Sequence, residues 1–122
     1  MQIGRVSTAM ITPFLPDGSI HFEMVAKLIE HLIATGTDSL VVCGTTGESP
    51  TLTSQEKADL IRFTVETVNK RIPVIAGTGS NSTQASIELT KMADEAGVDG
   101  IMLVTPYYNK PDQRGMYEHF KT

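Results

Sequence analysis

The class of fold is decided by the stretch Leu40-Val41-Val42-Cys43-Gly44-Thr45-Thr46-Gly47-Glu48-Ser49, in which a short apolar run leads into a turn of glycine and threonine. The run 40–43 is too short for a helix and has no polar alternation, which is typical of a strand buried on both faces of a parallel sheet. Similar runs lie at 6–11, 72–76 and 101–104. We therefore predict four buried parallel strands.

Segments with helical spacing of apolar residues separate these strands. The spacing is carried by Val25, Leu28, Ile29 and Leu32, then by Leu60, Ile61, Val65 and Val68, and finally by Ala85, Leu89, Met92, Ala93 and Ala96. A capping box at 53–56 predicts the start of the second helix, and Gly36 and Gly97 are expected to end the first and third in the left-handed conformation. Residues 116–122 are expected to open a fourth helix.

Four βα units of about 30 residues fit either an open doubly wound sheet or part of a closed barrel of about 250 residues. The turn 12–18 after the first strand lacks the glycine-rich pattern of a nucleotide-binding sheet. We therefore expect an α/β fold of the TIM (β/α)₈-barrel type with only about its first four units present. Residues 1–122 would form the N-terminal half of one barrel domain, ending before the fourth helix is complete.

Composition excludes several classes of function. With 40% apolar and 20% charged residues, the sequence is typical of a soluble globular protein. A net charge of −4 leaves no basic stripe for nucleic acid, and no apolar run approaches the ~20 residues of a membrane span. We expect a cytoplasmic protein whose single cysteine, Cys43, is a buried and inert thiol.

In α/β barrels the reactive groups lie at the carboxyl ends of the strands. All four predicted strands end in threonine, at Thr12, Thr45-Thr46, Thr78 and Thr105. Such hydroxyls suit the carboxylate and carbonyl oxygens of a small acid, although threonine is also a common residue at strand ends. The glycine-flanked turn 44–49 is either a binding loop or a plain connection.

No histidine, aspartate or lysine occupies a predicted strand end, so these residues supply only part of a catalytic site. The lysines, Lys57 among them, fall on helix faces or in loops, where a solvated position is usual. Tyr107 and Tyr108 follow the fourth strand and are either packing residues or, at a barrel rim, candidates for proton transfer.

The segments 44–49, 72–79 and 104–111 together resemble the dihydrodipicolinate synthase family, also named 4-hydroxy-tetrahydrodipicolinate synthase, and the resemblance spans the whole chain. It implies a lyase that condenses pyruvate with aspartate semialdehyde in lysine and diaminopimelate biosynthesis. In that reaction pyruvate forms a Schiff base with a lysine and then an enamine. The resemblance implies no cofactor and no metal ion.

The resemblance also assigns roles to individual residues. Thr45 and Tyr108 would belong to a hydroxyl proton relay, with Tyr108 reaching a neighbouring subunit of a homotetramer, and Thr46 would hold the pyruvate carboxylate. The Schiff-base lysine is expected on a sixth strand, beyond Thr122, so these 122 residues alone are not expected to form the enamine.

The same resemblance places Ser49, Asn81 and Tyr107 in a cleft at the subunit interface that binds lysine in feedback-inhibited members. Where those members carry two histidines and a glutamate, this chain has Ser54, Lys57 and Ala85. An added ammonium and a lost carboxylate repel the ammonium group of lysine, so we expect weak feedback inhibition.

Two other functions stay open. An N-acetylneuraminate lyase or a sugar-acid aldolase of the same superfamily would use the same lysine chemistry on a longer substrate. That lyase typically has Ser-Thr where this chain has Thr45-Thr46. A non-catalytic half-barrel would instead associate with another half, because open sheet edges favour association.

Overall fold

All four apolar runs contribute strands to one parallel sheet in the computed structural model, which describes residues 2–122. The strands are β1 (Ser7–Ala9), β2 (Ser39–Val42), β3 (Val74–Gly77) and β4 (Gly100–Met102), and they lie in the order β1-β2-β3-β4. Each strand begins or ends at a different residue from the apolar run that predicted it. Backbone hydrogen bonding defines the limits of a strand, and apolar character does not.

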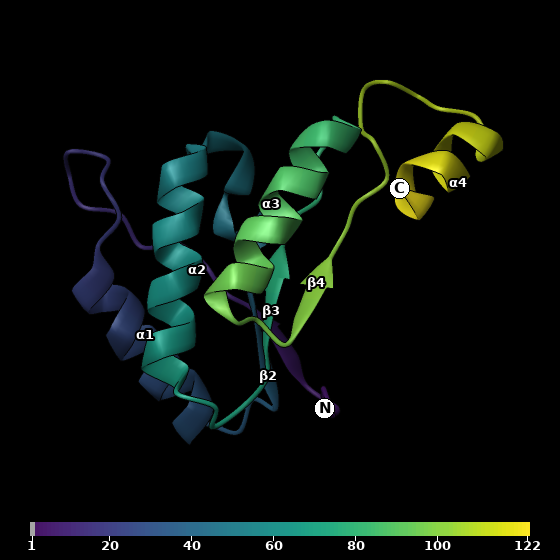
Figure 1. Cartoon of the computed structure of the whole chain (residues 1–122). Helices are drawn as coiled ribbons and strands as arrows, with labels where there is room; N and C mark the ends of the chain where they lie inside the picture. Colours follow the sequence, from purple (N-terminus) through teal and green to yellow (C-terminus); the bar gives the residue numbers. More distant parts are fainter. Residues whose placement is uncertain (1) are drawn as a thin grey trace.

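The helices are α1 (Phe22–Ala34), α2 (Ser54–Val68), α3 (Thr83–Ala96) and α4 (Gln113–Lys121). Figure 1 shows α1, α2 and α3 side by side over one face of the sheet. Right-handed crossovers between sequential parallel neighbours place α1, α2 and α3 on the same face, whereas a doubly wound sheet has helices on both. The strand order and the single helical layer confirm the four βα units of a (β/α)₈ barrel.

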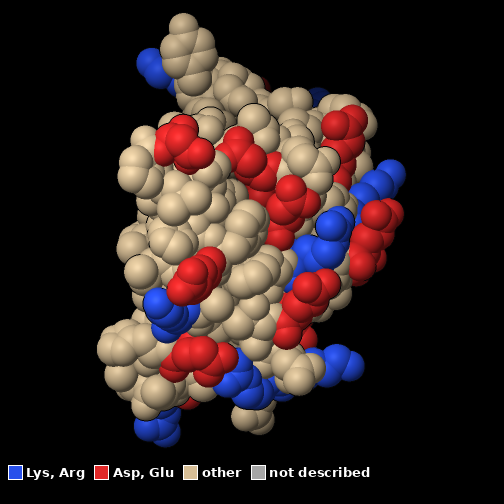
Figure 2. All heavy atoms as spheres, turned by 90° about the vertical axis from the view of Figure 1, so that its left-hand side faces the viewer, with Lys and Arg blue, Asp and Glu red and all other residues tan. Residues whose placement is uncertain are grey.

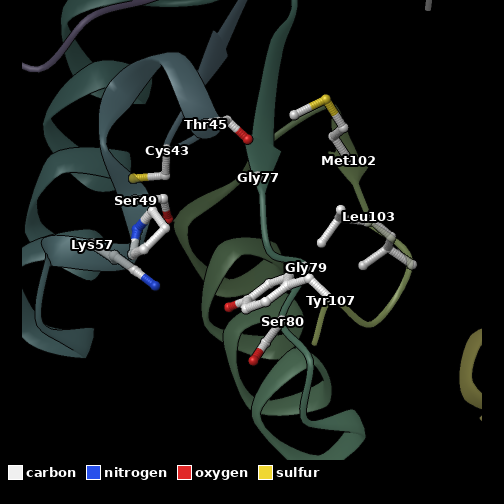
Figure 3. A pocket seen from close by; sticks show the side chains of 13 residues that line it. Cys43, Thr45, Ser49, Lys57, Gly77, Gly79, Ser80, Met102, Leu103 and Tyr107 are labelled. Carbon is white, nitrogen blue, oxygen red and sulfur yellow. The ribbon is translucent and has the colours of Figure 1, made fainter. Parts of the chain in front are cut away.

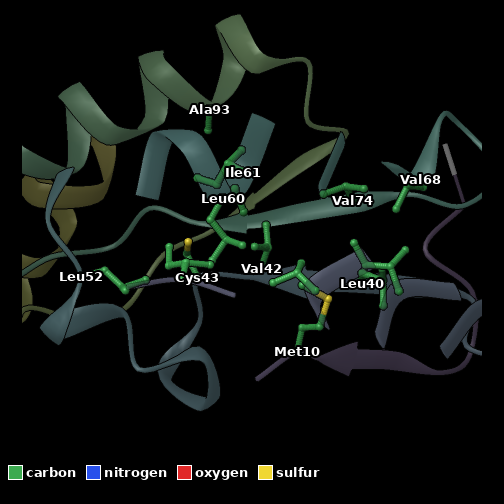
Figure 4. Close-up of a cluster of buried hydrophobic side chains, with 14 residues drawn as sticks. Met10, Leu40, Val42, Cys43, Leu52, Leu60, Ile61, Val68, Val74 and Ala93 are labelled. Atoms are coloured by element: carbon green, nitrogen blue, oxygen red, sulfur yellow. The ribbon is translucent and has the colours of Figure 1, made fainter. Parts of the chain in front are cut away.

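The core lies between this helical layer and the sheet (Figure 4). Leu40 and Val42 of β2 and Val74 and Ala76 of β3 face the helices, where they meet core residues that include Val25, Ile29, Leu60, Ile61, Val68 and Ala93. The strand register places Ala9, Val41, Ile75 and Gly100 in one row, which by alternation lies on the opposite face. A small residue at each end of that row leaves room on the face that a closed barrel would enclose.

Most predicted helix ends are confirmed. Thr53 and Glu56 form the complete capping box of α2. Gly36 and Gly97 have φ values of 99° and 86°, and after each of them a backbone N–H reaches back to a helix carbonyl, from Thr37 to Leu32 and from Val98 to Ala93. Both helices therefore end in the same left-handed turn.

The start of the fourth helix was predicted wrongly. Helix α4 begins at Gln113 and not at residue 116, because the Asp112 side chain accepts a hydrogen bond from the Gly115 N–H at 2.7 Å and caps the helix. Figure 1 shows α4 apart from the layer of α1–α3. A hydrogen bond of 2.7 Å between Thr83 Oγ1 and His119 Nδ1 connects α4 to the start of α3.

An aspartate after each left-handed turn ties the next strand to its neighbour. Asp38 Oδ2 accepts the backbone N–H groups of Arg5 and Val6 at 2.8 Å each, next to β1. Asp99 Oδ2 accepts the Val74 N–H at 2.9 Å, at the start of β3. The glycine-x-aspartate pattern therefore has the same role twice: its carboxylate accepts backbone N–H groups at or next to the amino end of the neighbouring strand.

We expect the Asp38 contact to make stability depend on pH. The N–H groups of Val6 and Arg5 lower the pKa of Asp38 in the folded state. A lowered folded pKa gives stability that is present above the unfolded pKa of about 4 and is lost as pH falls through the folded value. Urea midpoints measured through this window should fall less steeply for Asp38→Asn. An unchanged pH slope, matching that of the exposed control Asp94→Asn, would contradict the expectation.

Acidic and basic side chains are intermixed on the face shown in Figure 2, which carries no broad area of lysine and arginine. Among residues 2–122, no helix combines the length and the apolar character needed to cross a bilayer. The prediction of four buried strands is correct for β2 and β3 and wrong for the edge strands β1 and β4, each of which has one neighbouring strand among the described residues. Apolar side chains are exposed at both edges, including Val6 and Ile11 near β1 and Ile101 and Met102 in β4.

Candidate functional site

The loop after β2 consists of two single turns of 3₁₀ helix, η1 (Thr45–Gly47) and η2 (Ser49–Thr51), joined by Glu48 in the left-handed conformation. Thr12 Oγ1 donates to the Gly47 carbonyl oxygen at 2.7 Å, which fixes this loop against the end of β1. The side chains of Thr45 and Thr46 are exposed at the carboxyl ends of the strands. The turn is therefore a fixed loop that presents two hydroxyls.

The other strand-end threonines differ in their availability. Thr12 and Thr78 are buried, and their hydroxyls are engaged with the Gly47 carbonyl and, at 2.9 Å, with Thr90 Oγ1. Thr105 is exposed. At two of the strand ends the threonine hydroxyl therefore has a structural role, as is common for threonine at strand ends. The exposed hydroxyls are those of Thr45, Thr46 and Thr105.

A cavity of about 470 Å³ opens between the carboxyl ends of β2, β3 and β4, and we call it the strand-end cavity (Figure 3). Its polar lining consists of Cys43, Thr45, Ser49, Lys57, Ser80 and Tyr107. Its remaining walls consist of Gly44, Pro50, Gly77, Gly79, Met102, Leu103 and Val104. A volume of this size is ordinary for a small-molecule site.

Glycine permits the close approach that shapes the cavity. A Cβ built on Gly77 would lie 2.3 Å from the Cys43 carbonyl oxygen, and one on Gly79 would lie 2.6 Å from the Val104 backbone nitrogen. Any larger residue at either position would force neighbouring backbone apart. The Gly77-Thr78-Gly79 segment is therefore the tight packing element that brings the three strand ends together.

One positive charge dominates the electrostatics of the cavity. Within the part of the chain that the structure describes, Lys57 is the one charged residue in the lining. Burial raises the pKa of the Cys43 thiol to about 12, against the opposing effect of the Lys57 ammonium. Cys43 is 2% exposed and stays protonated at neutral pH, which confirms the buried thiol expected from the sequence.

The structure brings some predicted site residues together and separates others. Thr45, Ser49 and Tyr107 line the strand-end cavity, whereas Thr46, Asn81 and Tyr108 are outside its lining. Tyr108 is 93% exposed with a φ of 68°, so its backbone adopts the left-handed conformation and its side chain lies at the surface. The predicted roles of these six residues remain hypotheses.

Asn81 instead anchors the loop that carries the two tyrosines. Asn109 Nδ2 donates to the Asn81 carbonyl oxygen at 2.6 Å, and the Asn81 Nδ2 group lies 3.4 Å from Asn109 Oδ1. This pair joins the segment after β3 to the segment after β4. The position of Tyr107 at the cavity therefore depends on an amide pair outside it.

The general assignment of lysines to solvated surface is wrong for Lys57, which is half-buried and directs its ammonium toward the cavity in Figure 3. Its place in the first turn of α2, right after the capping box, could have indicated this position, since that turn faces the loop after β2. Ser80 and Met102 were also missed, and no local pattern marks them. Among residues 2–122, no three His, Cys, Asp or Glu side chains gather as metal ligands would.

Fold and site together define the class: a (β/α)₈-barrel scaffold with a hydroxyl-lined cavity at the carboxyl ends of its strands. The sequence model of the dihydrodipicolinate synthetase family matches residues 2–122. This chain belongs to that family.

Named relatives agree with this assignment. The 4-hydroxy-tetrahydrodipicolinate synthase of Bacillus subtilis is 64% identical over 121 residues, which cover 99% of this chain and 42% of that protein. The crystal structure of dihydrodipicolinate synthase from Bacillus anthracis has a TM-score of 0.97 at 61% identity and covers 99% of this chain and 41% of its own. The chloride-inhibited enzyme of Acinetobacter baumannii, solved with pyruvate, has a TM-score of 0.96 at 49% identity, over 98% of this chain and 41% of its own. The chain thus spans about two fifths of the length of these relatives.

Proposed function

We propose that this chain is part of a lyase that condenses pyruvate with L-aspartate 4-semialdehyde to give 4-hydroxy-tetrahydrodipicolinate, in lysine and diaminopimelate biosynthesis. The observation that carries the proposal is the family match over residues 2–122 together with the exposed Thr45 hydroxyl at the strand-end cavity. In this reaction a lysine amine attacks the pyruvate keto carbon, water leaves, and the resulting Schiff base becomes the enamine that attacks the aldehyde.

Thr45 and Tyr108 would relay protons, and Thr46 would hold the pyruvate carboxylate. The support for Thr45 is a fixed loop at the cavity, and a hydroxyl can accept one proton while it donates another. The support for Tyr108 is its 93% exposure on a left-handed backbone, since a side chain that projects from its own subunit is free to enter the site of a neighbour. Ser49, Asn81 and Tyr107 would belong to the interface cleft.

We further propose that residues 1–122 form the N-terminal half of a single barrel domain. The parallel strands β1 and β4 each have one partner strand within the described part of the chain, and apolar residues are exposed at both edges. Further βα units would cover these edges and supply the Schiff-base lysine. The complete protein would be a cytoplasmic homotetramer built as a dimer of dimers.

Two alternative functions differ from this proposal in the residues that they would require outside residues 1–122. A sugar-acid aldolase or N-acetylneuraminate lyase would keep the same lysine chemistry and differ in the groups that select the aldehyde. A half-barrel that associates with another half would leave Thr45 without a reacting partner. The exposed apolar edges are the feature that favours such association.

Trapping with pyruvate and borohydride tests the proposed function. The complete gene product should gain the mass of one reduced pyruvate on a lysine outside residues 1–122, because borohydride reduces the Schiff base to a stable amine. The chain of residues 1–122 should gain none, although Lys57 lines the cavity. An adduct on Lys57, or none on the complete protein, would overturn the proposal, and Lys57→Gln is the control for the first outcome.

We expect lysine to inhibit the complete protein weakly or not at all. Lys57 lines the cavity beside Ser49 and Tyr107, so its ammonium would oppose that of lysine, while Ser54 and Ala85 are outside the lining. Initial rates across a lysine series check this, with Lys57→His as the variant expected to become more sensitive. Strong inhibition of the unaltered enzyme by submillimolar lysine would refute it.

A further inference from the structure

We infer that Asn109 is a positioning residue, which holds the loop of residues 105–111 in the conformation that exposes Tyr108. We call this segment the tyrosine loop. The inference rests on the proposed function, in which the Tyr108 hydroxyl belongs to the proton relay. Two observations carry it: the backbone on both sides of Asn109 is left-handed, and the Asn109 side chain bonds to the segment after β3.

The residues on either side of Asn109 adopt a backbone conformation that side chains disfavour. Tyr108 has a φ of 68° and Lys110 has a φ of 48°. A left-handed residue that carries a side chain raises the free energy of its loop, so the conformation persists only where contacts hold it. Packing contributes little here, because Tyr108 is 93% exposed and Lys110 is exposed as well.

The side chain of Asn109 supplies contacts that can hold this conformation. Its Nδ2 donates to the Asn81 carbonyl oxygen at 2.6 Å, and its Oδ1 lies 3.4 Å from Asn81 Nδ2. Among the hydrogen bonds of the described residues, these are the ones that join the tyrosine loop to another part of the chain. The loop therefore depends on one side chain for its attachment.

The direction of the shorter bond identifies the group that matters. A carbonyl oxygen can only accept, so the Asn109 atom that faces it at 2.6 Å is the amide nitrogen. The acceptor is a main-chain atom and is present whatever residue stands at position 81. The Asn81 side chain contributes only the longer contact of 3.4 Å, which is weak. The tyrosine loop therefore requires a donor at position 109.

The acceptor belongs to a segment that is itself held in place. On one side of Asn81, the Ser80 N–H donates to the hydroxyl of the buried Ser86 at 3.0 Å. On the other side, the Ser82 hydroxyl caps the start of α3. These contacts fix the carbonyl oxygen between them. Through Asn109, the tyrosine loop is therefore attached to a fixed part of the fold.

Steady-state kinetics of the complete protein tests the inference with single and double variants. Asn109→Asp replaces the donor by an acceptor of the same shape, so kcat should fall about tenfold while KM for pyruvate changes little. Because Asn109 acts through Tyr108, the same substitution in a Tyr108→Phe background should lower kcat by less than about twofold. The control Gln113→Glu makes an equal exchange at an exposed position of α4 and should leave kcat unchanged.

Hydrogen–deuterium exchange of the complete protein, followed by mass spectrometry, gives a readout that does not depend on activity. Peptides that cover the tyrosine loop should exchange faster after Asn109→Asp, because the loop loses its attachment. Asn81→Ala keeps the main-chain acceptor and should leave their exchange nearly unchanged.

The outcomes separate this inference from the proposed function. A complete protein that forms no pyruvate adduct with borohydride would refute the reaction, and this inference with it. Where the adduct forms, the role of Asn109 alone is overturned by unchanged exchange of the tyrosine loop after Asn109→Asp. It is also overturned if Asn109→Asp lowers kcat as much in the Tyr108→Phe background as in the unaltered protein.

Discussion

Gly77→Ala is expected to lower the free energy of unfolding of this chain by about 3 kcal/mol or more, the upper end of the cost of overpacking a well-packed interior. The added Cβ would lie 2.3 Å from the Cys43 carbonyl oxygen and 2.8 Å from the Cys43 carbonyl carbon. Both are backbone atoms at the end of β2, so the overlap cannot be relieved by rotating a side chain. A loss of this size is a large fraction of the stability of an ordinary domain.

Urea unfolding followed by circular dichroism measures this loss, and Gly18→Ala is the matched control. Gly18 has a φ of 89° with nothing within 4 Å of a built Cβ, so its substitution should cost only the backbone strain of about 1–2 kcal/mol. Gly77→Ala should also perturb the cavity, since Cys43 and Gly77 both line it. A Gly77→Ala chain as stable as the Gly18→Ala chain would show that the strand ends can separate at little cost.

Thr45→Val should lower kcat of the complete protein by about 10²–10⁴-fold, the usual contribution of a positioned proton-transfer group. The substitution keeps the shape of the side chain and removes the hydroxyl that the proposed relay requires. Schiff-base formation and breakdown move protons repeatedly, so every step would depend on water in place of Thr45. The lost hydroxyl is exposed at the cavity, so the fold itself should be little affected.

Steady-state kinetics with both substrates checks this, with the pyruvate adduct as a second readout. KM for pyruvate should change far less than kcat, the adduct should form slowly, and Thr45→Ser should restore much of the rate. Thr67→Val, an equal change on α2 outside the cavity lining, should leave kcat unchanged. A Thr45→Val enzyme within about threefold of the unaltered rate would remove Thr45 from the relay.

Local chemistry explains why much of the fold could be predicted. The capping box at Thr53 and the left-handed turns at Gly36 and Gly97 depend on residues within a few positions of one another, and all three were confirmed. The start of α4 was missed although Asp112 is an ordinary N-cap residue. Helix α4 has nine residues and none of them is buried, so no apolar stripe marks where it begins.

The site could be predicted only in outline. That reactive groups gather at strand ends follows from parallel topology, and Thr45, Ser49 and Tyr107 do line one cavity. Whether a given threonine faces that cavity or is buried depends on whether its hydroxyl finds a hydrogen-bond partner elsewhere in the fold. Thr12 and Thr78 meet the Gly47 carbonyl and Thr90, 35 and 12 residues away in the sequence, so no local pattern indicated their burial.

The sequence by itself determined the four strands, the helices between them and most of their caps, because apolar periodicity and capping depend on near neighbours along the chain. Burial of all four strands was predicted wrongly, since only β2 and β3 are buried. Tertiary structure alone decided that the backbone of Cys43 leaves no room for a Cβ at position 77 and that the side chain of Lys57 lines the strand-end cavity. Each of these depends on segments that are distant in sequence and meet only when the chain folds. The positive charge of the cavity therefore follows from how the chain packs around Lys57, and the identity of the residues alone did not indicate it.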